Sequence, residues 1–292
     1  MTRSEIRANA EELEYMNTIL YYGINVNKQG LHHVYESDHI VQGICCEHTV
    51  RNYIYKKQFK TGMIDLKDCK KLKHKPLNKP KRPEYVKDPC ILVNHDYSCF
   101  IKYLSAHYGA TIVQLDSLEG KKGDSKAILV FSLPKYHFHW GMLIEKGNAM
   151  SVYEAVTSLF IKLGKEIVAK IFNICLCDNG IEFNLLYNIE RYPGDQQIVH
   201  VFYTRPHVPT DKTSCERENR EARNVFPKYT SFEKLTQDII NFGYSNLNST
   251  IYASLGNRYP YDLVYNAFGQ EFLDKIGIKR IDAKKVRLVP LI

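Results

Sequence analysis

The segment Leu176–Phe183 (LCDNGIEF) constrains the fold of this chain more than any other segment. Apolar residues precede it from Ile167 onward, and the acid Asp178 is followed at once by the turn-forming pair Asn179–Gly180. An apolar run that ends in this way predicts a buried strand with one carboxylate at its carboxyl end, where open α/β sheets carry their functional residues. Asp-Asn-Gly is also common in β-hairpin turns, so the motif alone leaves both interpretations open.

Two more segments bring acids into a similar setting. The predicted strand Ala110–Asp116 also ends on an aspartate, and Thr213–Arg223 has the capping residues and early acids of a helix start. Two strand-end aspartates and a helical glutamate provide the oxygen ligands of a two-metal phosphoryl-transfer site. A helix is predicted before these segments, over Tyr97–His107. Between them, strands are predicted over Ala127–Leu133 and Phe138–Ile144, and a helix over Ser151–Leu163.

Five motifs of the chain carry a family resemblance: Gln114–Asp116, Leu133–Phe138, Cys177–Phe183, Val201–Tyr203 with Pro206, and Phe226–Phe232. In this order they resemble the DDE-class transposases of bacterial insertion sequences, most closely the IS-thirty family, and the resemblance extends from about Asn27 to the C-terminus. It implies an α/β fold: an RNase H-like (retroviral integrase-like) mixed sheet flanked by helices, preceded by a small all-α helix-turn-helix region. The implied domains are a helix-turn-helix DNA-binding region at 1–60, a basic linker at 61–95, the catalytic core at 96–245 and a helical extension at 246–292.

The resemblance also implies one active site. Catalytic and metal-binding roles fall on three acids: Asp116, Asp178 and Glu216. Auxiliary roles fall on Asn179, Glu182 and Glu218. The implied cofactor is Mg²⁺, or Mn²⁺, as two ions, and the implied activity is metal-dependent cleavage and strand transfer of insertion-sequence DNA ends. Two alternatives are a DNA-binding repressor or remnant of the same family that has lost catalysis, and an RNase H-like nuclease without strand transfer.

Two glutamates of the third segment compete for the role of third acid. Counting back from the motif at Phe226 places Glu216 on the catalytic glutamate of the family. Residues at i, i+4 and i+7 share a helix face, so Glu216 would align with two cations able to hold DNA phosphates, Arg220 and Arg223. Glu218 would share its stripe with Ala222 and Val225 instead. Glu216 is therefore the expected catalytic glutamate.

Positive charge is concentrated in one part of the chain. The whole sequence has a net charge of +8, whereas Arg51–Cys90 alone holds 13 Lys or Arg residues against four acids. Prolines in this block exclude a continuous helix and predict an extended linker. Lysines on such a backbone can follow DNA phosphates, and those expected to do so are Lys70, Lys71, Lys73 and Lys75. A solvated basic linker without a partner accounts for the same charge.

A helix-turn-helix is expected before this linker. Helices are predicted over Leu31–Tyr35, Asp38–Gln42 and Glu47–Lys57, and the last turns its polar residues Thr49, Arg51 and Asn52 away from an apolar face, as a recognition helix does. Without the resemblance, an ordinary helical hairpin is the favoured explanation of this pattern. Arg220, Arg223 and Lys228 complete the residues expected to contact DNA. The expected partner is double-stranded DNA, both terminal inverted repeats and target, bound by a homo-oligomer because the chemistry joins paired ends.

Cysteines and apolar runs bear on the compartment. The eight cysteines contain no CxxC pair, no signal segment is recognisable, and no apolar run reaches membrane-spanning length. We therefore expect a cytoplasmic bacterial protein, associated with the nucleoid and not with a membrane. His137 and His139 would share a face of a predicted strand, and the lack of a third ligand nearby favours a structural role over zinc binding.

Overall fold

The computed structural model describes residues 8–67, 87–191, 197–206, 208, 211 and 213–292, without the side chains of 213–217. Alternating segments of the chain form two compact units. The first unit comprises Met1–Lys81, Ser249–Tyr259 and Ile281–Val289, and the second comprises Arg82–Asn248, Pro260–Arg280 and Pro290–Ile292. The helical extension expected at 246–292 is thus shared between the two units instead of forming a domain of its own.

Five strands form the central sheet of the second unit, in the order β3-β2-β1-β4-β5. Strand β2 runs antiparallel to β1 and β3, whereas β4 and β5 run parallel to β1. A mixed sheet flanked by helices is what the sequence predicts. The strands are β1 Ile112–Glu119, β2 Lys126–Leu133, β3 Phe138–Glu145, β4 Ile174–Cys177 and β5 His200–Tyr203.

Both strands that were expected to end on an aspartate differ from the prediction. Strand β1 continues past Asp116, because the residues from Asp116 to Glu119 pair with β2. The apolar run before Asp178 is mostly helical: α8 covers Lys165–Ile171, and only four residues form β4. Periodicity alone does not separate a buried strand from a short buried helix. The hairpin interpretation of Asp-Asn-Gly is wrong, because a 3₁₀ helix, η4 (Ile181–Phe183), follows it.

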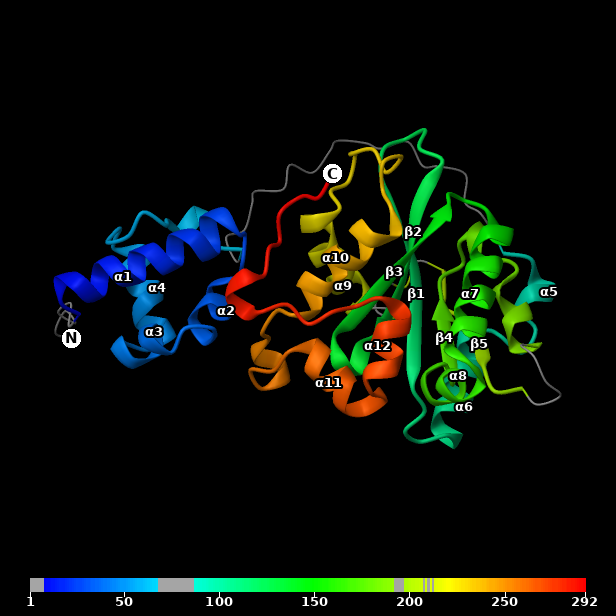
Figure 1. Ribbon diagram of the computed structural model, residues 1–292. Coiled ribbons are helices and arrows are strands. Elements are labelled where there is room, and N and C mark those ends of the chain that lie inside the picture. Colours follow the sequence, from blue (N-terminus) through cyan, green and yellow to red (C-terminus); the bar gives the residue numbers. More distant parts are fainter. Residues whose placement is uncertain (1–7, 68–86, 192–196, 207, 209–210, 212) are drawn as a thin grey trace. The chain divides into compact units, whose positions relative to one another are not determined.

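Helices cover both faces of the sheet. In the view of Figure 1, α9 (Thr213–Val225) and α10 (Gln237–Asn248) lie on one side of it, and α7 (Ala149–Leu163) and α8 lie on the other. Helix α6 (Tyr97–Ala106) packs on β4 and β5 through a small apolar cluster. The unit also contains α5 (Pro89–Leu92), η3 (Pro134–Tyr136), η5 (Leu186–Arg191), α11 (Pro260–Phe268) and α12 (Gln270–Ile276).

Buried aromatic rings hold the meander of β1, β2 and β3 in place. The ring of Trp140 stacks on Phe131 at 5.0 Å between centroids and meets Phe272 of α12 edge-on at 5.6 Å. Phe172 packs against Phe160 of α7 at 4.8 Å. Truncation of a buried aromatic residue to alanine costs about 3–5 kcal/mol, so this layer strongly favours one register of the strands.

The first unit is helical, as the sequence predicts. Its helices are α1 (Ala10–Leu20), the π-helix η1 (Tyr21–Val26), α2 (Leu31–Glu36), α3 (His39–Ile44) and α4 (Glu47–Tyr55), with 3₁₀ turns η2 (Met63–Asp65), η7 (Ala253–Leu255) and η8 (Ala283–Lys285). Cys45 and Cys46 alone separate α3 from α4. Apolar side chains from all five of these helices meet in its core, including Met16, Ile24, Val34, Val41 and Val50.

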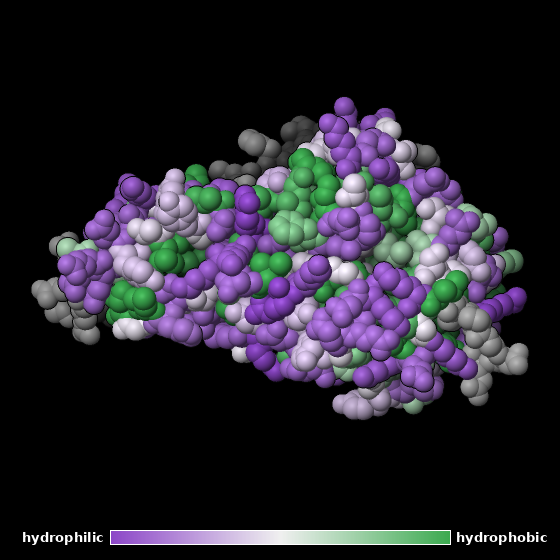
Figure 2. Space-filling model, in the orientation of Figure 1, coloured by the Kyte–Doolittle hydropathy of each residue, from purple (hydrophilic) through white to green (hydrophobic). Residues whose placement is uncertain are grey.

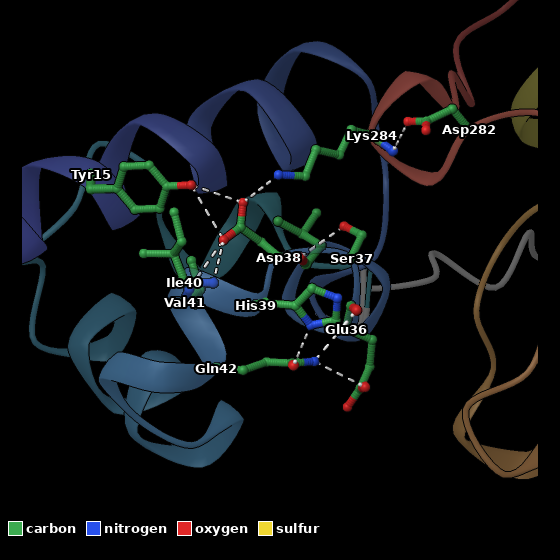
Figure 3. A network of polar contacts seen from close by, with 11 residues as sticks. Tyr15, Glu36, Ser37, Asp38, His39, Ile40, Val41, Gln42, Asp282 and Lys284 are labelled. Atoms are coloured by element: carbon green, nitrogen blue, oxygen red, sulfur yellow. Dashed lines mark hydrogen bonds and ion pairs between the residues drawn. The ribbon is translucent and has the colours of Figure 1, made fainter.

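A buried carboxylate ties the C-terminal segment of this unit to its N-terminal helices (Figure 3). Asp38 caps α3 by accepting from the backbone of Ile40 and Val41, and it also accepts from the hydroxyl of Tyr15 and from Lys284 Nζ at 2.9 Å. Burial acts to raise the pKa of Asp38, but the bonds from Lys284, Val41 and Tyr15 outweigh it and lower the pKa. This network explains why 281–289 belongs to the first unit.

The visible surface is mostly polar. Figure 2 shows a face on which hydrophilic residues predominate and hydrophobic ones are scattered among them. Within the described parts of the chain, every helix is too short or too polar to traverse a lipid bilayer.

Candidate active site

The parallel pairing of β1 and β4 brings the two predicted aspartates to the same level. Ile112 pairs with Ile174, and Gln114 pairs with Leu176. Asp116 lies two residues beyond the second of these pairs on β1, and Asp178 lies two residues beyond it in the other segment, directly after β4. Neighbouring strands lie about 4.8 Å apart, and the charges of both aspartates act on Glu182, so the two carboxylates lie in one region of the structure.

A third acid, Glu182, lies against this pair. The hydroxyl of Ser117 donates to Glu182 Oε1 at 2.9 Å, and the backbone N–H of Ser117 donates to Asp116 Oδ1 at 2.9 Å. Burial raises the pKa of Glu182, and the charges of Asp178 and Asp116 raise it further, against a lowering by its hydrogen bonds. Glu182 is therefore close enough to both aspartates to interact with them electrostatically.

Gly180 allows the acids to approach so closely. Its backbone N–H donates to Asp178 Oδ1 at 2.8 Å. A Cβ atom on residue 180 would collide with the carboxylate of Glu182 and would lie 3.0 Å from Asp178 Oδ1. The glycine of the Asp-Asn-Gly motif thus serves close packing of two carboxylates.

The loop that carries Asp178 is fastened to the end of β5. Asn179 Nδ2 donates to the carbonyl of Thr204 at 2.7 Å, and the hydroxyl of Tyr203 donates to the carbonyl of Phe183 at 2.9 Å. Asn179 Oδ1 is buried and accepts no hydrogen bond from any residue that the structure describes. The side chain of Asn179, for which an auxiliary role is predicted, therefore lies inside the loop that carries Asp178.

Helix α9 meets β1 through a residue that the sequence did not indicate. Asn219 Nδ2 donates to Asp116 Oδ2 at 2.6 Å, and one turn later Arg223 Nη1 donates to the carbonyl of Glu119 at 2.7 Å. Burial lowers the pKa of Arg223, whereas the charges of Asp116 and Glu119 act to raise it. The predicted helix thus lies against the strand that carries Asp116.

The structure describes the side chain of only one of the two competing glutamates of α9, Glu218. Glu218 is 2% exposed and accepts from the hydroxyl of Ser132 on β2, and its stripe partners Ala222 and Val225 are buried as expected. The side chain of Glu216 lies outside the described part of the structure. Position 216 is three residues before Asn219 and seven before Arg223, the spacing of one helix face. Glu216 remains the predicted third ligand.

The basic residues expected to contact DNA fall into three groups. Arg220 and Lys228 are exposed, and Lys228 Nζ lies 5.3 Å from the ring centroid of Tyr229. Thr49, Arg51 and Asn52 are partly exposed on α4, whose other face is buried. The linker lysines Lys70, Lys71, Lys73 and Lys75 lie outside the described residues.

The acids of the site meet part of the ligand requirement of a divalent cation. In the described ranges, no three His, Cys, Asp or Glu side chains are grouped so that they could hold a metal. Asp116 and Asp178 supply the carboxylate oxygens that Mg²⁺ prefers, and they would fit it once one more acid joined them. The two histidines considered for zinc do not share a strand face, because His137 precedes β3 in a left-handed conformation and only His139 lies on the strand.

Comparisons with known proteins give similarities to solved structures but no match to a family model or a curated protein. Among solved structures, the chain is similar to the catalytic core domain of BIV integrase, with 16% sequence identity and a TM-score of 0.37. The similarity covers 54% of this chain and 95% of that core domain.

Proposed function

We propose that this protein is a DDE-class transposase of the IS-thirty type, which cleaves insertion-sequence DNA ends and joins them to target DNA with the help of Mg²⁺ or Mn²⁺. The observation that carries the proposal is the parallel register of β1 and β4, whose last pair, Gln114 with Leu176, lies two residues before Asp116 and two residues before Asp178. Functional residues of open α/β sheets lie where adjoining parallel strands end their pairing.

The residues of the site have separable roles in this proposal. Asp116 and Asp178, joined by Glu216, would hold the cations, which when bound lower the pKa of the attacking water and stabilise the leaving oxygen. Asn219 and the Ser117 backbone each bond one oxygen of Asp116 and so fix the orientation of its carboxylate. Fixed ligands support catalysis because they need not reorganise during the reaction.

In this proposal, DNA is held by basic side chains near the acids and by the helical unit. Exposed Arg220 and Lys228 can bind phosphates, and Thr49, Arg51 and Asn52 of α4 have the exposure that groove contacts require. Phosphate contacts release counterions, so binding should weaken steeply with salt. Because two ends must be joined, a homo-oligomer is part of the proposal.

The test uses the full chain with Mg²⁺ or Mn²⁺ and duplexes taken from the DNA that flanks its coding region. We expect nicking at the element ends and a loss of about a hundredfold or more in Asp178→Asn, since even outer-shell changes at metal sites cost 10–100-fold. The matched control is Asp238→Asn, the same change at an exposed residue of α10.

Each outcome has a definite meaning. Cleavage that survives Asp178→Asn refutes the assigned site. Specific binding of the ends without cleavage by the wild type supports the alternative of a DNA-binding repressor or remnant. Cleavage without joining supports the nuclease alternative.

A further inference from the structure

Lys87 is an unusual residue beside the candidate active site. It is 3% exposed, although lysine is almost never fully buried without a charged partner. Its Nζ atom lies 3.4 Å from the carbonyl oxygen of Gly180 and 3.9 Å from the ring centroid of Tyr203. No carboxylate among the residues that the structure describes forms an ion pair with it.

The contacts of Lys87 converge on the loop that carries Asp178. The carbonyl of Gly180 accepts both from Lys87 and from the backbone N–H of Phe183, which closes the turn at 3.1 Å. The ring beneath the ammonium belongs to Tyr203, whose hydroxyl holds the carbonyl of Phe183. Lys87 and Tyr203 together thus hold both ends of the turn from Gly180 to Phe183.

The acids near Lys87 give a reason for its charge. Burial lowers its pKa, while the charges of Cys177, Asp178 and Glu182 act to raise it. A buried ammonium costs free energy that methionine, with a similar length, would not cost. What distinguishes this position from an ordinary packing position is that two acids of the site, Asp178 and Glu182, lie near enough to act electrostatically on the ammonium group.

We propose that Lys87 is a positioning residue of the acidic site, whose ammonium group holds the Gly180 carbonyl and thereby fixes the turn that sets Asp178 and Glu182. The inference rests on the proposed function only in regarding Asp178 as a metal ligand. The anchoring of the turn is independent of it.

The experiment measures amide hydrogen exchange of the metal-free full chain with and without the lysine. In Lys87→Met, exchange at Phe183 should accelerate about tenfold to a hundredfold, as expected when a charge-assisted hydrogen bond that holds the turn is lost. Exchange in β4 should not change. Lys126→Met is the matched control, because Lys126 Nζ also donates to backbone carbonyls, those of Glu233 and Leu235, away from the acids.

Chemical rescue separates charge from packing. Lys87→Ala leaves space for a small alkylammonium ion, and we expect n-butylammonium to restore slow exchange at Phe183, whereas n-butanol does not. Equal rescue by the alcohol overturns the proposal, since it shows that the position needs only volume. Unchanged exchange in Lys87→Met also overturns it. If that variant does not fold, Lys87→Gln takes its place, with the same expected acceleration and the same refuting result.

A separate titration with Mn²⁺ keeps this inference distinct from the proposed function. The wild type should bind Mn²⁺, and Lys87→Met should bind it more weakly because Asp178 is less well fixed. A wild type that does not bind Mn²⁺ contradicts the proposed function and leaves the exchange result as it is. Binding that is equally tight in both proteins contradicts the role assigned to Lys87.

Discussion

Replacement of Asn219 by aspartate tests the central contact of the site, the bond from α9 to Asp116. Asn219 Nδ2 donates to Asp116 Oδ2 at 2.6 Å, and both side chains are partly buried. Asn219→Asp is nearly isosteric, but it replaces the donor by a second carboxylate. The variant therefore loses a bond and gains a repulsion at one point.

The size of the effect follows from the geometry. A hydrogen bond to a charged group contributes about 1.5–3 kcal/mol. After the side chains relax to about 4 Å, two unit charges repel by about 1 kcal/mol in water and about 4 kcal/mol near a protein surface. Because the pair is partly exposed, we expect a total loss near the lower end, about 3 kcal/mol. For a unit of this size that lowers Tm by roughly 10 °C.

Thermal unfolding near neutral pH, without divalent cations, is the assay. Asn219→Ala should show a smaller loss, because it removes the bond without adding a charge. Asn224→Asp, exposed on the same helix, controls for the added charge itself. Addition of Mg²⁺ should restore stability to Asn219→Asp more than to either control, since a ligand that binds only the folded state stabilises it.

Two results would refute this reasoning. If Asn219→Asp unfolds at the same temperature as Asn224→Asp, residue 219 does not face Asp116 and α9 has another rotation about its axis. If the loss occurs but Mg²⁺ does not reduce it, the acids are close together yet do not form a cation site.

Two further predictions concern pH. The pKa of Glu182 is raised, chiefly by burial, so the folded state holds this proton more tightly than the unfolded state does. The free energy of unfolding therefore falls as the pH rises from the ordinary carboxyl value of 4.5 through the folded pKa. Glu182→Gln should stabilise the metal-free protein at pH ~8 and have less effect at pH ~4, and a stabilisation that does not grow with pH would contradict this. The pKa of His95 is raised above 6.5, chiefly by its hydrogen bond to Glu190 at 3.3 Å, so this pair stabilises the fold below that pH and the contribution is lost as pH rises through the folded pKa. Glu190→Gln keeps an acceptor for the backbone of Val201 and should lower the unfolding temperature more at pH ~5.5 than at pH ~8.5, and an equal loss at both values would show that the pair is not ionic.

Most helices and strands of the core could be predicted from the sequence. The helix expected from Ser151 begins two residues earlier, at Ala149, because Asn148 caps it. The strand expected over Phe138–Ile144 gains one residue, because Glu145 pairs with Lys126. Such elements are predictable because apolar spacing and capping are local properties of the chain. The helix α8 was missed because a short apolar run next to a strand has no period that distinguishes the two.

The side-chain contacts of the acids could not be predicted from the sequence in this way. The sequence predicts that Glu218 lies on the same stripe of α9 as Ala222 and Val225, and all three are buried. This could be predicted because a stripe of residues is a property of a single helix. The sequence carries no sign that Asn219 would bond Asp116, 103 residues away, or that Lys87 would reach Gly180, 93 residues away. Neither residue belongs to a recognisable motif.

The sequence by itself determined the kinds of elements, their order and the two aspartates that follow apolar segments, because these depend on neighbouring residues. Only the tertiary structure decided that β1 and β4 pair in the register that brings Asp116 and Asp178 into one region, that Glu182 bonds to Ser117 beside Asp116, that Asn219 bonds to Asp116, and that Lys87 bonds to Gly180. Those facts depend on strand register and on the rotation of a helix about its axis. Both are fixed by packing between distant segments, which no local pattern encodes.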